Sequence, residues 1–287
     1  MSDNFEEQFL LMVVPYDKSF DGYYPSSHPK GGQLIPVEPI PNADVWIKAV
    51  REDLKKISQT KVGNLLLRSI KYHGKVITIR PIRADYCNSV TWEGVTTHSK
   101  DNLQIGTGAD IQFNPETYKI GGTCETKHLQ MGGFHIESHE TLLHELVHAF
   151  RKVSGKLSIT GVGKGLSFYG NNEEFNAVLV QGIYASERRT PVRSSHFHHF
   201  EIDKELSGSL KFFQTSSEAF YYVEKFCLEN PGFTKGFINV DAGFNPINAY
   251  YNDKELAKQF SRSATAKRRD MAMPILKATI NFLREHL

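Results

Sequence analysis

The stretch Thr141-Leu-Leu-His144-Glu145-Leu-Val-His148-Ala-Phe150 carries the pattern that decides how this chain is interpreted. His144 and His148 are four residues apart, so on a helix they lie one above the other and point to the same place. Glu145 lies about 100° further round such a helix, where its carboxylate can reach a water molecule beside a metal ion without binding the ion. The spacing therefore predicts two zinc ligands and a general base.

The neighbours of these three residues indicate that the helix is buried. Two histidines and a glutamate inside an apolar helix need polar partners, which a metal ion and a water molecule supply directly. The alternative is a solvated helix that carries the same pattern by chance and needs no metal. The apolar neighbours are Leu142, Leu143, Leu146 and Val147.

A catalytic zinc ion usually keeps three protein ligands and leaves the fourth position to water or substrate. The metzincin arrangement would need a glycine at position 151 and a histidine at position 154. Arg151 and Ser154 occupy these positions, so that arrangement is excluded. The other option is a glutamate from a following helix.

Glu173 and Glu174 open the next predicted helix, which follows a glycine-rich connector that lets it fold back beside the first. Adjacent helical residues point about 100° apart, so only one of the two can be a ligand. We choose Glu174, because its neighbours favour a packed environment and a close approach of the helices, and Glu173 remains the alternative. The neighbours are Phe175, Ala177, Val178 and Leu179.

Hydrophobic periodicity predicts an α+β protein with a small mixed sheet, the central helix and a mainly helical C-terminal half. We expect an N-terminal arm over residues 1–42 and a single domain over 43–287, with an active-site core over about 60–197 and a helical part over 200–287. Ser138 is the expected N-cap of the central helix, and Gly155 its expected end. Strands are expected over residues 9–14, 75–80 and 108–114, and helices over 43–57, 63–71, 138–153, 172–187, 217–228, 253–260 and 273–287.

Composition narrows the classes of function. The chain has 287 residues, and 34 Lys and Arg against 32 Asp and Glu give a formal net charge of +2. Near-neutrality argues against nucleic-acid binding, which needs a basic face. A chain of this length can fold without a metal ion, so a metal bound here is functional. The cysteines Cys87, Cys124 and Cys227 indicate no disulfide framework and a reducing compartment.

The sequence predicts neither a signal peptide nor a membrane span. The apolar stretch over residues 9–14 is short and follows two glutamates. A secretory signal needs a basic start and about 7–15 apolar residues, and a membrane-spanning helix needs about 20. We therefore expect a chain that is made in the cytoplasm and does not associate with membranes. We also expect it to act as a monomer.

Four segments resemble gluzincin-type zinc metallopeptidases, and in particular the NleD-like family of bacterial effector and toxin peptidases. The resemblance covers about residues 60–197, and the zinc-binding segments are its specific part. Glu174-Phe-Asn-Ala177 is also similar to the third-ligand helix of anthrax lethal-factor-like peptidases, which supports Glu174. The four segments are Gly63-Asn-Leu-Leu-Leu67, Gly108-Ala-Asp-Ile-Gln-Phe-Asn-Pro115, Leu143-His-Glu-Leu-Val-His-Ala149 and Glu173-Glu-Phe-Asn-Ala177.

The resemblance implies a zincin-like fold with one catalytic Zn²⁺ and an endopeptidase that cleaves a protein target by a Glu-activated water. It suggests a host signalling protein as the target, and delivery by a specialised secretion system into the cytosol of a host or target cell. Related peptidases place an Arg, Tyr or His donor for the reacting carbonyl oxygen beyond the glutamate helix. Here the candidates are Arg193, His196 and, less favoured, Tyr184, each with a solvated surface residue as its alternative.

The resemblance also suggests that the strand over residues 108–114 is a sheet edge that binds an extended substrate, and an ordinary core strand is the alternative. Two other functions remain open. A binding module in which zinc only fixes two helices would have four protein ligands and no open position. An aminopeptidase or amidohydrolase for a small substrate would have a closed pocket instead of an open groove.

Overall fold

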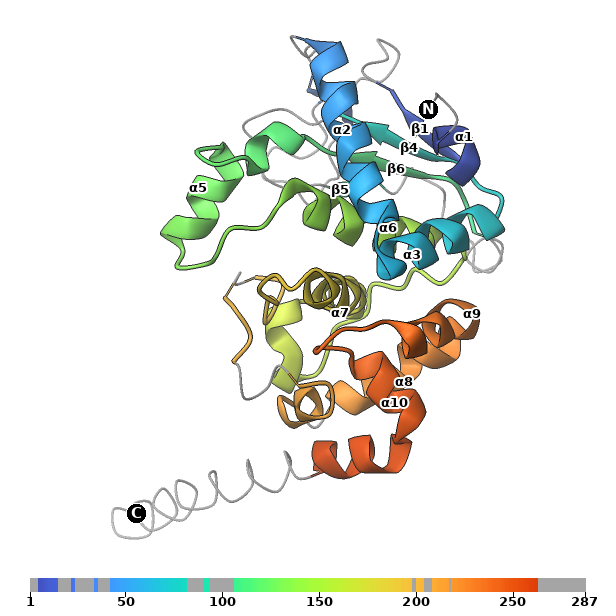
Figure 1. Ribbon diagram of the computed structural model, residues 1–287, viewed down its shortest axis with the longest axis vertical. Coiled ribbons are helices and arrows are strands. Elements are labelled where there is room, and N and C mark those ends of the chain that lie inside the picture. Colours follow the sequence, from blue (N-terminus) through green and yellow to red (C-terminus); the bar gives the residue numbers. More distant parts are fainter. Residues whose placement is uncertain are drawn as a thin grey trace, which may run out of the picture.

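The computed structural model describes residues 5–14, 22–23, 34–35, 42–81, 90–92, 106–197, 200–203, 208–216 and 218–262. Cys87 and the helix expected over residues 273–287 lie outside the described residues. Within them the protein is a mixed α+β structure, as the sequence predicts, with more helix than strand. The sheet, α2, α3 and α6 lie in one half of the molecule, and α7 to α10 lie in the other half (Figure 1).

The central sheet is small and mixed. Its strands are β1 (Leu11–Val13), β4 (Ile77–Arg80), β6 (Ala109–Gln112) and β5 (Val90–Trp92), and they lie in the order β1-β4-β6-β5. The first three are parallel, and β5 is antiparallel to β6. Alternate residues of β4 and β6 are buried, which is the period of a strand with one face on the core. A separate two-stranded ribbon joins β2 (Gly22–Tyr23) to β3 (Leu34–Ile35).

The position of β6 corrects one expectation. The segment over residues 108–114 does form a strand, but β6 lies between β4 and β5, and its two edges are both paired. A substrate cannot add a strand to an edge that is already hydrogen-bonded. On this side of the sheet, β5 is the outermost of the described strands.

The strand expected over residues 9–14 is shorter than predicted. Helix α1 (Phe5–Phe9) precedes it, with Glu6 and Glu7 in its first turn, where acidic residues are favourable. Leu10 then has a φ of 55°, which ends the helix and redirects the chain into β1. Because β1 pairs with β4, part of the segment expected as an N-terminal arm belongs to the central sheet.

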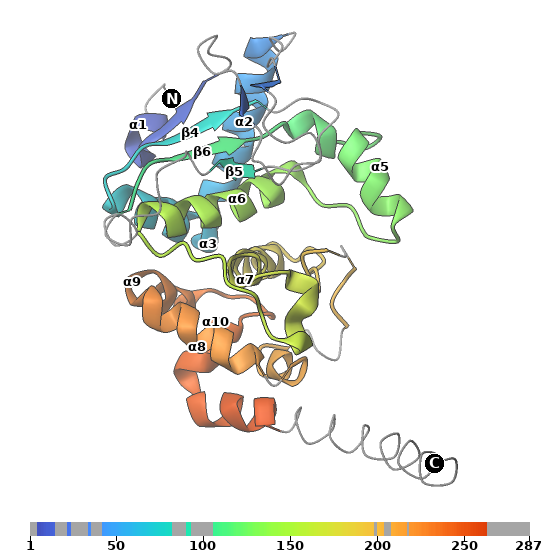
Figure 2. The ribbon, with the colours of Figure 1, turned by 180° about the vertical axis from the view of Figure 1, so that it is seen from behind.

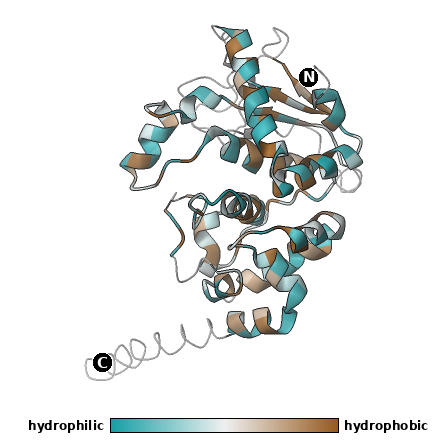
Figure 3. Ribbon diagram, viewed as in Figure 1, coloured by the Kyte–Doolittle hydropathy of each residue, from teal (hydrophilic) through white to brown (hydrophobic). Residues whose placement is uncertain are grey.

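Two amphipathic helices follow in the sequence. They are α2 (Ala43–Ser58) and α3 (Lys61–Tyr72), close to their predicted bounds. The hydroxyl of Thr60 accepts a hydrogen bond from the amide of Gly63 and caps α3. Polar and apolar residues both occur along α2 (Figure 3), because one side of this helix is solvated and the other is packed on α6.

The helices α6 (Ser138–Val153) and α7 (Asn172–Glu187) have the predicted bounds and pack closely on each other. Nearly every residue of α6 is buried. Gly155 has a φ of 69°, and a glycine adopts this left-handed conformation after a helix end without strain. Ser138 was expected as the N-cap, but Glu137 holds that position and Ser138 begins the helix. The Ser138 side chain pairs with Asp53 instead of a backbone amide.

Short helices complete the structure. Seen from behind, α6 lies beside the sheet and α7 lies between α6 and the helices that follow (Figure 2). The prediction for residues 217–228 is confirmed within two residues, whereas α9 and α10 were not predicted. None of the described helices is both long and apolar enough to cross a membrane. The remaining elements are α5 (Thr123–Gln130), α8 (Ala219–Glu229), α9 (Pro231–Thr234), α10 (Pro246–Asn252), helical residues 254–262, and the 3₁₀ segments Pro115–Tyr118, Lys164–Tyr169, Lys211–Gln214 and Lys235–Asn239.

Cys124 and Cys227 are buried. Burial raises the pKa of the Cys227 thiol to about 12. Both side chains belong to the hydrophobic core.

Candidate metal centre

Helix α6 brings two imidazole rings together on the side that faces α7. The Nε2 atoms of His144 and His148 are 3.1 Å apart, and the ring centroids are 4.8 Å apart in an edge-to-face arrangement. Both side chains are buried. The i, i+4 spacing thus directs two nitrogen atoms to one point.

Helix α7 adds a carboxylate at the same point. Oε2 of Glu174 is 3.1 Å from Nε2 of His144 and 3.3 Å from Nε2 of His148. One ligand atom from each residue lies within 4.8 Å of the others, so His144, His148 and Glu174 could hold a metal ion. Asn171 fixes the start of α7, because its side chain accepts hydrogen bonds from the amides of both Glu173 and Glu174.

Glu173 points elsewhere. Its carboxylate accepts hydrogen bonds from Arg151, with Nε at 3.0 Å and Nη2 at 2.7 Å, and from the amide of Ser158 at 2.9 Å. Arg151 and Glu173 are both buried. The sequence alone left these two glutamates as alternatives, because the partner that occupies Glu173 lies on α6, 22 residues earlier.

The protonation of the three candidate ligands is coupled. Burial would raise the pKa of Glu174, but hydrogen bonds with His144 and His148 outweigh it and hold that pKa well below its usual range. Burial would lower the pKa of His148, but the Glu174 carboxylate raises it to about 9. Burial dominates at His144 and lowers its pKa to about 3. A single proton on His148 therefore balances the charge of Glu174.

Glu145 is buried on α6, next in sequence to His144. Its negative charge is one of the influences that raise the pKa of His148, so its carboxylate acts on the centre electrostatically. Its position between two candidate ligands on one helix suits a group that serves the centre without binding the ion.

A residue that the sequence did not suggest supports His144. Oε1 of Gln181 on α7 lies 3.2 Å from Nδ1 of His144, which leaves Nε2 of that ring for a metal ion. The same oxygen accepts a hydrogen bond from Nη1 of Arg193 at 3.1 Å. Gln181 is two helical turns after Glu174 and so shares its face of α7, and this periodicity was the available signal.

Arg193 was a candidate hydrogen-bond donor to the reacting carbonyl oxygen, but its guanidinium donates its hydrogen bonds to other groups of the protein. Besides Gln181, it donates to the carbonyl oxygens of Ser195 at 2.8 Å and His196 at 2.7 Å. Burial lowers its pKa to about 10, so the group stays charged at neutral pH. Arg193 therefore holds the short loop that carries His196 in place beside α7.

His196 reaches the centre. Its Nε2 atom is 3.2 Å from Oε2 of Glu174, and its ring stacks on that of His144 with centroids 5.7 Å apart. About a third of the side chain is exposed, so His196 borders both the centre and solvent. Burial lowers its pKa. Backbone hydrogen bonds join Ser194 to Phe200 and Ile202 to Val192, so residues 192–194 and 200–202 lie side by side.

Tyr184 lies apart from the centre. Its hydroxyl is 2.9 Å from Nδ1 of His139, and its side chain is fully buried near the start of α6. The structure therefore brings together Glu145, His144, His148, Glu174 and His196 but not Tyr184.

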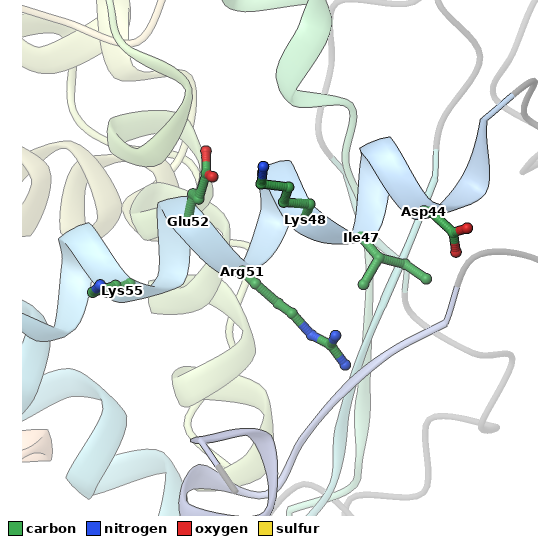
Figure 4. A pocket seen from close by; sticks show the side chains of 6 residues that line it. All are labelled: Asp44, Ile47, Lys48, Arg51, Glu52 and Lys55. Carbon is green, nitrogen blue, oxygen red and sulfur yellow. The ribbon is translucent and has the colours of Figure 1, made fainter. Parts of the chain in front are cut away.

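Figure 4 shows a separate pocket on the outer face of α2, and none of these residues lines it. We assign that pocket no function.

The fold and the site point to a class of protein. A mixed α+β core with two histidines and a glutamate that could hold a metal ion is consistent with a peptidase domain. A family model described as an effector protein, Peptidase_M91, matches residues 40–194, which is more than half of the chain. The chain belongs to this family of effector peptidases, and its resemblance to the NleD-like peptidases is confirmed.

The comparison with curated proteins found no match to this chain. Membership of a metallopeptidase family implies a bound metal, and an effector peptidase implies a protein substrate. It also suggests that the protein is delivered into host cells.

Proposed function

We propose that this effector peptidase is a zinc-dependent endopeptidase that hydrolyses a protein target in the cell into which it is delivered. The observation that carries the proposal is the convergence of His144, His148 and Glu174 on one point at the junction of α6 and α7. The remaining expectations join the proposal: a single zincin-like domain that includes strand β1 as well as residues 43–287, and delivery by a specialised secretion system.

The three side chains fit a zinc ion. Two imidazole nitrogens and one carboxylate oxygen are a usual donor set of catalytic zinc. A tetrahedral zinc ion with ligand distances of about 2.0–2.1 Å separates its ligand atoms by about 3.3 Å. The separations of 3.1, 3.1 and 3.3 Å between the side-chain atoms agree with that value.

The protein's own residues then have distinct tasks. When bound, zinc polarises the substrate carbonyl and lowers the pKa of water towards about 7. Glu145 takes the proton of the attacking water on its carboxylate and passes it to the nitrogen of the leaving amine. Gln181 holds the His144 ring so that Nε2 stays directed at the ion.

We assign the oxyanion donor to His196 rather than Arg193. The Nε2 atom of His196 is at the centre, whereas the guanidinium of Arg193 is bonded to Gln181 and to two carbonyl oxygens of the loop. Loss of one such donor typically raises the barrier by about 2.7–4 kcal/mol.

The approach of His196 to Glu174 also favours a second candidate function. If His196 were a fourth ligand, the zinc ion would have no open position, and the protein would be a binding module whose helices the metal fixes. His196→Phe distinguishes the two readings: as a donor its loss leaves zinc affinity within about threefold, whereas loss of a ligand lowers zinc affinity far more.

The test of the proposed function compares cleaved protein termini in cells that express the wild type or Glu145→Gln. We expect one equivalent of zinc in both proteins and new termini only with the wild type, because the variant keeps the ligands and loses the base. Absence of stoichiometric zinc from the wild type, or unchanged cleavage by the variant, would refute the proposal.

A further inference from the structure

The most completely buried charged side chain near the metal centre is that of Arg151. Its guanidinium is fully buried and joins three segments of the chain. Nε and Nη2 donate to both oxygens of Glu173 on α7, Nη1 donates to Oε2 of Glu229 on α8 at 2.7 Å, and Nη2 also donates to the carbonyl of Lys156 at 2.6 Å. All three nitrogens of the planar guanidinium thus donate hydrogen bonds, and their acceptors lie on three different segments.

The position of this cluster relates it to the ligands. Arg151 lies one helical turn after His148 on α6, and Glu173 directly precedes Glu174 on α7. The hydrogen bonds between Arg151 and Glu173 therefore fix the two helices against each other within one turn of a candidate ligand on each. A shift of α7 along α6 would break the paired hydrogen bonds and also move Glu174 relative to the histidines.

The third member comes from outside the region that defines the family. The family match ends at residue 194, and Glu229 is the last residue of α8. Phe226, one turn earlier on α8, places its ring centroid 5.8 Å from the guanidinium carbon of Arg151. The C-terminal helices therefore contribute directly to the surroundings of the Arg151–Glu173 pair.

We propose that Arg151 is a positioning residue for the metal centre, and that Glu229 of α8 helps it to hold Glu174 in reach of His144 and His148. The inference rests on the proposed function, because it takes these three residues as the ligands. It assigns the helical C-terminal part a task that the family match does not cover.

A purely structural ion pair would affect stability alone, so the test measures metal affinity. The variants are Arg151→Lys, Glu173→Gln and Glu229→Gln. Lysine keeps the charge but cannot form the fork of hydrogen bonds. Zinc dissociation constants are measured by competition with a chromogenic chelator, and the visible absorption of bound Co²⁺ reports the geometry of the ligands. Unfolding of each metal-free protein is measured in parallel.

We expect Arg151→Lys and Glu173→Gln to weaken zinc binding by about 10- to 100-fold, the usual effect of losing a residue that orients a ligand. The Co²⁺ absorption should fall, because water replaces a displaced Glu174. Glu229→Gln should weaken zinc binding by about threefold or more. Because the side chain of Glu229 is about a quarter exposed, this variant keeps the test open if Arg151→Lys does not fold.

The matched control is Val223→Ala on α8, which removes buried apolar volume without touching the ion pair. It should lower stability and leave zinc affinity within about twofold of the wild type. The inference is overturned if the three variants also keep zinc affinity within twofold while losing stability. If the wild type does not bind zinc, or if His144→Ala leaves the zinc affinity unchanged, the proposed metal centre itself is refuted.

Discussion

At the scale of single residues, the metal centre shows what a sequence pattern can and cannot predict. On a helix, His144 and His148 point in the same direction and Glu145 points about 100° further round, so the sequence alone predicts how these three side chains are placed. The choice between Glu173 and Glu174 depends on Arg151, which lies on another helix and binds Glu173. The periodicity of α7 alone cannot reveal a partner on α6. Gln181 was open to the same periodicity argument, two turns after Glu174, but nothing in its chemistry marks an amide as a metal-site residue.

The shared proton of the centre leads to a prediction about metal binding. The pKa of His148 is raised to about 9 by the Glu174 carboxylate, and zinc binds only the neutral imidazole. At pH 7 we expect zinc binding to release about one proton, and zinc affinity to rise about tenfold per pH unit up to pH 9. Calorimetry in buffers of different ionisation enthalpy measures the release. A buffer-independent enthalpy at pH 7 would contradict it.

Glu140 gives a prediction about stability. It is buried on α6, where its Oε1 accepts a hydrogen bond from the hydroxyl of Thr190 at 2.9 Å, and burial raises its pKa from 4.5 to about 7. The folded state therefore binds this proton more tightly than the unfolded state. The resulting stability is complete below pH 4.5 and is lost as pH rises through about 7.

We accordingly expect Glu140→Gln to match the wild type near pH 4.5 and to be more stable at pH 8 by up to about 3 kcal/mol. Chemical denaturation at both pH values measures this difference, and other titrating groups affect both proteins alike. The exposed Glu52→Gln serves as the control for replacing a carboxylate on the protein surface. An equal effect of Glu140→Gln at pH 4.5 and pH 8 would show that Glu140 does not titrate in this range.

At the scale of elements, the long periodic helices were predicted with accurate bounds, whereas the short ones were not. α9 and α10 each begin with a proline and span one or two turns, too few for a hydrophobic period to emerge. Strand β6 was found, but its neighbours in the sheet depend on pairing between distant segments, so the sequence could not decide between an edge strand and the core strand that it forms. Local pattern determines an element, and tertiary pairing determines its place.

The N-terminus of α7 allows a direct test at this scale. The Asn171 side chain accepts hydrogen bonds from the amides of Glu173 and Glu174 at 2.9 and 3.0 Å. We expect Asn171→Ala to lower the free energy of unfolding by about 1 kcal/mol, because both amides lose their acceptor at the start of the helix. Asn171→Asp, which keeps an acceptor, should lose much less. Equal stabilities of the alanine variant and the wild type in urea denaturation would contradict the capping role.

At the scale of the whole molecule, we propose that the C-terminal helices and the family-defining region form one folding unit. The ring of Phe175 on α7 contacts that of Tyr222 on α8, with centroids 5.6 Å apart, and Gly182 lies against Phe244. Arg151 and Glu229 add a partly buried ionic contact between the same parts. Removal of α8 to α10 would expose apolar area on α7 that a separate domain would not expose.

A shortened chain that ends at residue 203 tests whether the C-terminal helices and the family-defining region form one folding unit. We expect it to aggregate, or to be digested rapidly by a protease under conditions in which the full chain resists, because the buried face of α7 loses its cover. The full chain under identical expression conditions is the control. A soluble, protease-resistant shortened chain that binds zinc as tightly as the full chain would show that residues 1–203 fold independently.

The division of the ligands between two helices has a consequence for an effector that is delivered into another cell. His144 and His148 come from α6, and Glu174 comes from α7 after the intervening loop. An unfolded chain offers no preformed set of three, so it captures zinc weakly and has no competent peptidase centre. If the chain is delivered unfolded, the proposed peptidase centre is absent during delivery and forms only where the chain refolds.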